Sequence, residues 1–388
     1  MSGFTSHDNF VAKVSGEQRR WIQSGSKQFN PTAAAVANEW HTLFRGGGYP
    51  QADAIFDAGT NLQFQSVFDV TTNAGCIYHG GNVGVNGDDF KTLIAGIANT
   101  AAATVVPGSL LLVDVLGFHR VTTVTTTTEQ ATVNSNTFTA SSSTGLLLTY
   151  ANDWSNYQKV RFTNSGGALP TGLSAGTDYW LVRQSATTAK VATSYANALA
   201  GTVVAYTDAG TGTHTLTCRL PRYSDGAGVQ AIFFNPSSTA LGAGTPGLAL
   251  NYTNSAGTAS RATPTTPSLP IGKTAATNSH VLYSGATGAG KMGPFMPLQA
   301  ADAGIQSIQG IRNNATYTSG SYTVAYVKQL GRIPLNVLGQ DTAMDFTTTF
   351  PSFPPVYDGA ALYLLWKSGV ATPANSAFDF DFIFGWNA

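Results

Sequence analysis

The segment whose spacing comes nearest to a chemical motif is Gly285–Met292, with the sequence GATGAGKM. It approaches the phosphate-binding pattern G-x-x-x-x-G-K-[ST], in which backbone amides and a lysine hold phosphates and a hydroxyl holds Mg²⁺. Met292 stands where the pattern requires that hydroxyl. The Pro-containing stretch Gly293–Pro297 does not favour the helix whose N-terminus would face the phosphates. We therefore interpret the segment as a loop and predict no nucleotide site.

A pair of carboxylates lies near the C-terminal end, at Asp379 and Asp381 within Phe378–Phe384. Alternation places both on one face of a strand, and paired carboxylates bind Ca²⁺ or act as general acid and base. The opposite face carries four Phe residues, and no third acidic residue lies nearby in the sequence. We interpret the pair as the polar outer face of a strand.

Histidines and cysteines show no metal-ligand spacing. The two cysteines, Cys76 and Cys218, form neither a disulfide framework nor a zinc motif, and a site built on Cys76 and His79 would need two more ligands. The six histidines are His7, His41, His79, His119, His214 and His280. We expect buried thiols, no metal, no cofactor and no catalytic site, and hence a protein that is not an enzyme.

Three aromatic residues in the middle of the chain suggest a sugar-binding platform, Trp154, Tyr157 and Trp180. Aromatic faces offer apolar area to a pyranose ring while the polar tip stays wet. Alternation along Asp178–Val182 turns Tyr179 and Trp180 to opposite faces, so one of these two belongs to a core. The sequence leaves open whether the three aromatics contact a glycan or pack inside a domain.

The chain is unusually poor in charge. Only 10% of its 388 residues are Asp, Glu, Lys or Arg, against about 25% in a typical soluble domain. Twenty acidic and twenty basic residues cancel, so copies repel each other weakly and no field attracts nucleic acid or an anionic membrane. The composition favours a chain packed against neighbours, with a secreted adhesin or carbohydrate-binding domain as the alternative.

The sequence contains no evident export or membrane segment. Its first residues are polar and lack the basic-then-apolar pattern of a signal peptide. The best apolar run, Ser109–Phe118, is interrupted by Asp114 and is shorter than the ~18–20 residues of a membrane span. We expect folding in a cytoplasm, which weakens the secreted alternative.

The first fifty residues are locally enriched in charge. Arg19, Arg20 and Trp21 stand together there, and Arg and Trp are frequent anchors of protein interfaces. We predict that residues 1–50 form an N-terminal arm with a short helix, in which these three residues contact a shell or a neighbouring subunit. The alternative is an ordered terminus that packs on its own domain.

Two segments have the apolar spacing of an amphipathic helix. The first begins at residues 30–32, where Pro31 suits a first helical turn, and ends at the glycines 46–48. Its apolar residues Val36, Trp40 and Leu43 follow at i, i+4 and i+7. The second runs from residue 88 or 89 to about 101. Its apolar stripe consists of Phe90, Leu93, Ile94 and Ile97.

Almost all of the remaining chain has the pattern of short strands between turns rich in Gly, Ser, Asn or Pro. The clearest strand is Phe378–Phe384, and Ser321–Val327 also alternates with period two. Further predicted strands are Val121–Thr128, Leu146–Tyr150, Ala231–Phe234 and Val281–Tyr283. Many short strands indicate sandwiches or jelly rolls rather than a parallel α/β sheet.

Residues 134–217 form a separate group of predicted strands. These are Tyr157–Asn164, Asp178–Gln184, Thr188–Ser194, Thr202–Thr207 and Thr213–Cys218. The spacing is typical of a seven-strand sandwich of roughly 80–100 residues. An inserted domain needs its two ends close together, so we expect the flanking residues near 119–124 and 220–223 to be neighbours.

Two stretches of this region resemble an immunoglobulin-like module of tailed-phage virion proteins. They are Phe162–Val182, FTNSGGALPTGLSAGTDYWLV, and Thr207–Leu216, TDAGTGTHTL. The resemblance covers about 80 of the 388 residues, and the module occurs on capsid, decoration and tail proteins alike. It implies an immunoglobulin-like sandwich at 134–217 and a place in a phage particle, without identifying the part.

Together these patterns predict a mainly β protein with a few short helices. A jelly-roll or sandwich body, residues 51–133 and 218–388, carries the inserted immunoglobulin-like domain at 134–217. We expect a non-enzymatic virion protein, assembled in the host cytoplasm, whose preferred role is capsid decoration or stabilisation. One alternative is a tail, collar or fibre component whose inserted module binds a host-surface glycan. The other is the major capsid protein, although the long spine helix of that fold is not visible.

The expected partners follow from this role. They are other virion proteins, from the capsid shell or the tail, and further copies of the chain in a homo-oligomer. A trimer is one solution where a shell offers three-fold sites. We expect no nucleic-acid, membrane or cofactor partner.

Overall fold

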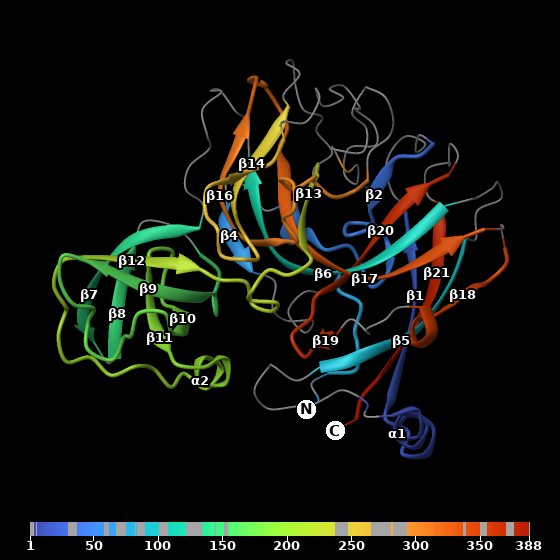
Figure 1. Cartoon of the computed structure of the whole chain (residues 1–388), viewed down its shortest axis with the longest axis horizontal. Helices are drawn as coiled ribbons and strands as arrows, with labels where there is room; N and C mark the ends of the chain where they lie inside the picture. The colour runs from blue at the N-terminus through green and yellow to red at the C-terminus, as the bar shows by residue number, and fades with distance from the viewer. Residues whose placement is uncertain are drawn as a thin grey trace.

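In the described part of the chain, β-strands are the main secondary structure, arranged as several sheets and one barrel (Figure 1). The computed structural model describes residues 4, 6–29, 37–57, 62–66, 75–81, 83, 90–100, 108–121, 134–143, 145–150, 154–236, 247–264, 281, 293–336, 339–349, 355–369 and 376–387. The predicted mainly β fold class is confirmed.

The first and last strands lie side by side in one sheet, which we name the terminal sheet. Its strands are β1 (Arg20–Gln28), β3 (Gly48–Tyr49), β5 (Phe90–Thr100), β18 (Thr342–Asp345), β19 (Pro355–Tyr357) and β21 (Ala377–Gly385). The order is β18–β5–β21–β1–β3, with β19 also paired to β5. β1 and β21 pair from Arg20↔Gly385 to Gln28↔Ala377, so the first and the last strand of the described chain are neighbours in this sheet.

A second six-stranded sheet, the central sheet, packs against the terminal sheet. Its strands are β2 (Trp40–Thr42), β4 (Leu62–Ser66), β6 (Gly108–Val121), β13 (Val229–Phe234), β17 (Tyr322–Leu335) and β20 (Leu362–Ser368). β6 is buried on both faces: Leu112 packs with Phe382 of the terminal sheet, and Val113 packs with Phe44 and Phe56 on the other side. Two buried layers explain why β6 is a nearly continuous apolar run.

Residues 135–218 form a closed six-stranded barrel that lies to one side of the sheets (Figure 1). The barrel strands are β7 (Ser135–Ser143), β8 (Gly145–Tyr150), β9 (Lys159–Ser165), β10 (Asp178–Arg183), β11 (Thr188–Ala192) and β12 (Thr213–Cys218). Their order is β10–β11–β8–β7–β12–β9, closing back on β10. The ends of the barrel are adjacent, because the Cys218 amide donates to the Asn134 carbonyl at 2.7 Å.

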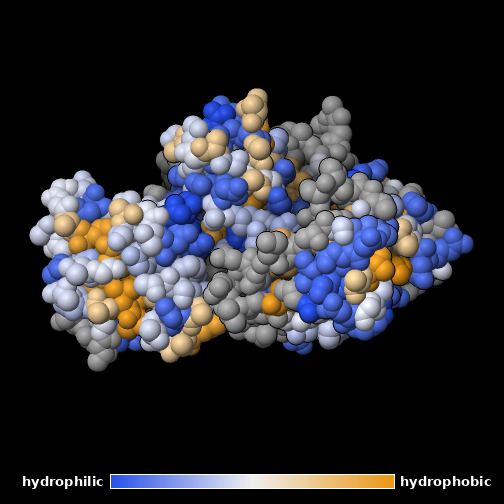
Figure 2. Space-filling view, turned by 60° about the horizontal axis from the view of Figure 1, so that its bottom comes forward, coloured by the Kyte–Doolittle hydropathy of each residue, from blue (hydrophilic) through white to orange (hydrophobic). Residues whose placement is uncertain are grey.

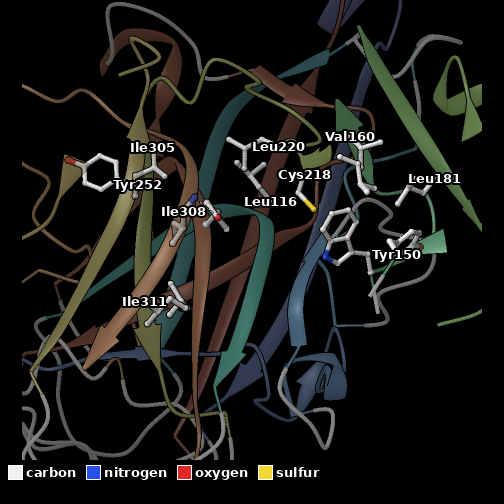
Figure 3. Packing of buried hydrophobic residues seen from close by; sticks show 14 of the residues in the cluster. Leu116, Tyr150, Val160, Leu181, Cys218, Leu220, Tyr252, Ile305, Ile308 and Ile311 are labelled. Carbon is white, nitrogen blue, oxygen red and sulfur yellow. Dashed lines mark hydrogen bonds between the residues drawn. The ribbon is translucent and has the colours of Figure 1, made fainter. Parts of the chain in front are cut away.

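A small sheet and the barrel share one continuous apolar core. The sheet consists of β15 (Arg261–Ala262), β14 (Leu248–Asn254) and β16 (Ile305–Asn313), in that order. Figure 3 shows Cys218 and Leu220 lying between Val160 of the barrel and Ile308 of the small sheet. The barrel is therefore packed against the rest of the molecule at its base.

Helices are few and short. They are α1 (His7–Val11), the π-helix η1 (Ala12–Gly16), the 3₁₀ helix η2 (Ala54–Asp57), α2 (Tyr195–Leu199) and α3 (Phe346–Thr349). The hydroxyl of Ser6 caps α1 by accepting a hydrogen bond from the Asn9 amide at 3.0 Å. Within the described segments, no helix has the length and apolar composition needed to cross a membrane.

Several strands agree with the sequence pattern. β8 and β13 reproduce Leu146–Tyr150 and Ala231–Phe234, and β17 begins within Ser321–Val327. In β21 the four Phe side chains are buried while Asp379 is exposed, as period-two alternation predicts. Predicted strand residues 122–128 and 282–283 lie outside the described residues, and so does the whole glycine-rich loop 285–292.

Both predicted helices are wrong where the structure describes them. Residues 90–100 form β5, in which a register shift against β21 leaves Ile94 as an extra residue between Leu93 and Ala95. At this bulge Leu93 enters the core between the sheets while Ile94 packs beside Gly385 and Val14, so two consecutive apolar residues are buried and the pattern mimics a helical spacing. Trp40 belongs to β2, which pairs with β20, while residues 30–36 lie outside the described residues.

The inserted region is a closed six-stranded barrel rather than the expected seven-strand sandwich. The predicted strand Thr202–Thr207 is not a strand. Val204 alone reaches between two barrel strands: its amide donates to the Val191 carbonyl at 2.7 Å, and its carbonyl accepts from the Leu146 amide at 3.0 Å. The other predicted strands of the region correspond to β9, β10, β11 and β12, and these close into the barrel.

Candidate interaction surfaces

The segment 1–50, which we expected to be an arm, contributes the strands β1, β2 and β3 to the sheets of the body. Arg20 and Trp21 open β1 and pair with Gly385 and Phe384 of β21. The carbonyl of Arg19 accepts a hydrogen bond from the Trp386 amide at 3.2 Å. Complete pairing with β21 satisfies one side of the β1 backbone, so the segment is held in the sheet rather than detached.

The predicted interface residues are nevertheless at the surface. Arg19 forms an ion pair with Glu17 at 2.7 Å between Nε and Oε2. The indole of Trp21 contacts Tyr78 edge-on, with ring centroids 5.3 Å apart, and remains 38% exposed. Trp21 therefore combines a fixed orientation with open apolar area, the combination found in interface anchors.

On the face of the terminal sheet opposite to the Trp21 side chain, apolar side chains lie at the surface. Ile22 of β1 is 52% exposed and lies opposite Ile383 of β21, which is half-buried. Half-buried Ile97 of β5 and exposed Ala343 of β18 lie on the same face, with half-buried Asp381 of β21 opposite Ile97. We name these four apolar residues the assembly face. Figure 2 shows an apolar patch within hydrophilic surface on the side of the molecule that carries this sheet.

The aromatic residues of the barrel do not form the expected three-residue platform. Trp154 is 1% exposed and stacks on Tyr150 inside the barrel core, with ring centroids 5.5 Å apart. Its participation in a sugar contact is therefore wrong, because neither ring face can reach solvent. The expected split between neighbours is confirmed: Tyr179 points into the barrel, where it is 4% exposed.

The other two aromatics lie on the outside of the barrel in different surroundings. Tyr157 is half-buried and meets Tyr195 of α2 edge-on at 5.8 Å between centroids. Trp180 is half-buried and lies under the Lys159 ammonium, 5.4 Å from Nζ to the ring centroid. Lys159 also pairs with Asp178 at 3.1 Å. The sequence does not indicate this charged surrounding of Trp180, because Lys159 lies on the neighbouring strand β9.

Titratable side chains are also buried inside the body. Lys91 Nζ lies 3.2 Å from His79 Nδ1 and donates to the Gly81 carbonyl. Burial lowers the pKa of Lys91 to about 8 and that of His79 to about 3. This arrangement holds the segment that includes Gly81 against β5.

Both thiols are buried, as expected. Burial raises the pKa of Cys76 and of Cys218, which disfavours the reactive thiolate form. In the described part of the chain, no group of three or more His, Cys, Asp or Glu side chains is placed to hold a metal ion.

Comparisons with known proteins identify no family. No family model matches the chain, and no curated protein matches it. Solved structures with weak similarity include the infectious bursal disease virus VP2 subviral particle, at 8% identity over 97% of this chain and 86% of that chain, with a TM-score of 0.17. The infectious bursal disease virus Gx strain structure has 10% identity over 98% and 87%, with a TM-score of 0.17. At such TM-scores the similarity carries no argument about fold or function.

Proposed function

We propose that this chain is a non-enzymatic structural protein of a tailed-phage particle, specifically a capsid decoration or stabilising protein. The observation that carries the proposal is the assembly face: exposed and half-buried apolar residues on a sheet in which the first strand β1 pairs with the last strand β21. Low charge and zero net charge support close packing of copies. The resemblance of Phe162–Val182 and Thr207–Leu216 to phage modules supports the phage context.

In this role the assembly face meets another virion protein or a further copy of the chain. Covering Ile22 and its apolar neighbours removes them from water, which stabilises an interface by about 25 cal/mol per Å² of apolar area. Each copy need contribute only modest contacts, because a shell repeats them many times. A homo-oligomer, for example a trimer at three-fold sites, places the barrel outward on the virion surface.

The assembly role is tested by a charge placed on the assembly face. We expect Ile22→Glu to weaken binding to purified capsids by at least tenfold, because burying an unpaired carboxylate is costly. Binding is measured by co-sedimentation of the full-length protein with particles that lack it. Val11→Glu is the matched control, since Val11 is 45% exposed in α1, outside the assembly face.

Unchanged capsid binding by a folded Ile22→Glu variant would contradict this use of the face. Thermal unfolding of both variants distinguishes loss of binding from loss of folding. A deletion of residues 1–30 is not a suitable test, because it removes β1 from the middle of the pairing between β21 and β3.

A second candidate is a tail, collar or fibre component whose barrel contacts the host surface. The barrel's place at one side of the molecule (Figure 1) and the half-buried Trp180 favour it. Copy number per particle separates the two, since decoration of a shell requires hundreds of copies and a tail component about a dozen. Immunogold label restricted to tails would contradict decoration. No specific observation favours the major capsid protein. That fold has a long spine helix, whereas no helix among the described residues exceeds five residues.

A further inference from the structure

The strands β9 and β10 and the residue that follows β12 place several charged side chains side by side on the outside of the barrel. β9 pairs with β10 so that Lys159 lies opposite Trp180, and Arg161 lies opposite Asp178. On the other side of β9, the Arg219 amide donates to the Lys159 carbonyl at 2.8 Å, just beyond the end of β12. Because Val160 between them is fully buried, Lys159 and Arg161 both point away from the barrel interior, although Lys159 is only 9% exposed.

This group of side chains carries more positive than negative charge. Asp178 pairs with Lys159 at 3.1 Å and also accepts a hydrogen bond from Arg161 Nε. One carboxylate thus serves two cations, and Arg219 adds a third. The local balance is +2 in a chain whose overall charge is zero. We name Lys159, Arg161, Asp178, Trp180 and Arg219 the cationic patch.

The guanidinium groups of the cationic patch have N–H donors without a hydrogen-bond partner among the described residues. Arg161 engages Asp178 through Nε and is 38% exposed, and no described residue pairs with its two terminal nitrogens. Arg219 donates from Nη2 to the Ser224 carbonyl at 3.1 Å, while its buried Nε has no partner among the described residues. Burial, and then the charge of Arg161, lower the pKa of Arg219. The two arginines therefore repel each other, and an anion between them would relieve that repulsion.

We propose that the cationic patch binds the carboxylate of an acidic saccharide. A guanidinium offers a planar pair of donors that matches a carboxylate, and the half-buried Trp180 ring beside it offers apolar area to the sugar ring. Lys159 and the indole already form one unit through their cation–π contact. A neutral glycan would use the aromatic ring but not the arginines. The presence of both therefore favours a saccharide that carries a carboxylate.

Nucleic acid fits the patch less well. Binding a phosphate backbone requires a basic stripe that follows successive phosphates. Here the positive charge is confined to three residues on adjacent strands, and Asp178 lies among them. The assignment does not depend on the role of the chain in a virion, because it rests on the barrel and the adjoining Arg219.

The proposal is tested by calorimetric titration of the full-length protein with trigalacturonate, maltotriose and inorganic phosphate. We expect trigalacturonate to bind, the neutral maltotriose not to bind, and phosphate to bind at least tenfold more weakly than trigalacturonate. Arg161→Gln and Trp180→Leu should each weaken trigalacturonate binding by about tenfold or more. Raising the salt concentration should weaken it too, because the attraction is screened.

Asp178→Asn gives the sharpest result. It removes the carboxylate that competes with the ligand, so we expect trigalacturonate binding to become several-fold tighter. Damage to the fold would weaken binding in every variant and could not produce this opposite sign. Arg183→Gln is the charge-matched control, since Arg183 is exposed at the far end of β10.

Two outcomes would overturn the proposal. Absence of trigalacturonate binding, or equal binding by wild type and a folded Arg161→Gln variant, excludes the site. Phosphate binding as tight as trigalacturonate, unaffected by Trp180→Leu, leaves a general anion site and excludes the saccharide assignment. Thermal unfolding of each variant accompanies the titrations.

Discussion

At the scale of single residues, Asp114 shows how a polar group is accommodated in the most apolar strand of the chain. It lies fully buried in β6 and accepts two hydrogen bonds from Arg222, at 2.8 Å from Nε and 2.6 Å from Nη2. It also accepts a hydrogen bond from the Ala361 amide at 3.0 Å. Arg222 lies shortly after β12, the last barrel strand, which ends at Cys218. This bidentate pair therefore links the chain that leaves the barrel to the central sheet.

Breaking this pair should be costly. We expect Asp114→Asn to lower the free energy of unfolding by about 3–5 kcal/mol, because it leaves the Arg222 charge buried without its counter-ion. Denaturant titration followed by circular dichroism measures the change. Asp379→Asn, on the exposed face of β21, is the matched control and should change stability by no more than about 0.5 kcal/mol. A loss below about 1 kcal/mol for Asp114→Asn would contradict the importance of the pair.

At the scale of elements, the three-stranded sheet depends on one carboxylate at its edge. Asp302 accepts hydrogen bonds from Arg261 at 3.0 Å and 3.1 Å, from Tyr252 at 2.5 Å and from Asn254 at 2.7 Å. Arg261 belongs to β15, while Tyr252 and Asn254 belong to β14. Asp302 thus holds the short strand β15 against β14, although β15 contributes only two residues.

This cluster predicts a pH dependence. The hydrogen bonds from Arg261 and from Tyr252 lower the pKa of Asp302 from 3.8 to about 2. Because the folded pKa lies below the unfolded value, the stabilisation is present above pH 3.8 and is lost as the pH falls toward 2. We expect Asp302→Asn to lower stability at pH 7 and to flatten the stability curve between these values. Equal acid dependence in wild type and variant, measured by thermal unfolding, would contradict the assignment.

At the scale of the whole molecule, the barrel is an insertion whose two ends meet. Ser135 lies opposite Thr217 in the pairing of β7 with β12, and neither the terminal nor the central sheet contains a strand from residues 135–218. The body is therefore complete without the barrel, apart from the shared apolar core at its base (Figure 3).

Removing the barrel should spare the body. We expect a chain in which a short Gly-Ser linker replaces residues 135–217 to fold, and to bind capsids as the full-length chain does, while losing trigalacturonate binding. The retained Asp114–Arg222 pair holds the new junction. Circular dichroism, co-sedimentation and calorimetry measure the three properties. A linker variant that remains unfolded would show that the shared core at the barrel base is indispensable to the body.

The sequence by itself determined the β-rich class and its clearest strands. Period-two alternation is a local property of the chain, so Phe378–Phe384 and Leu146–Tyr150 revealed their buried faces directly. The burial of both cysteines also followed from their type and isolation. The proposed place in a phage particle rests on local sequence resemblance and remains a proposal.

Only the tertiary structure decided how these strands are combined. The bulge in β5 arises from its pairing with β21, which no local spacing of Leu93 and Ile94 can indicate. The burial of Trp154 depends on closure of the barrel around it. The cationic patch likewise exists because register brings Arg161 and Asp178, 17 residues apart, into contact. Contacts across strands depend on the partners that each strand finds, and that choice is made by the whole core at once.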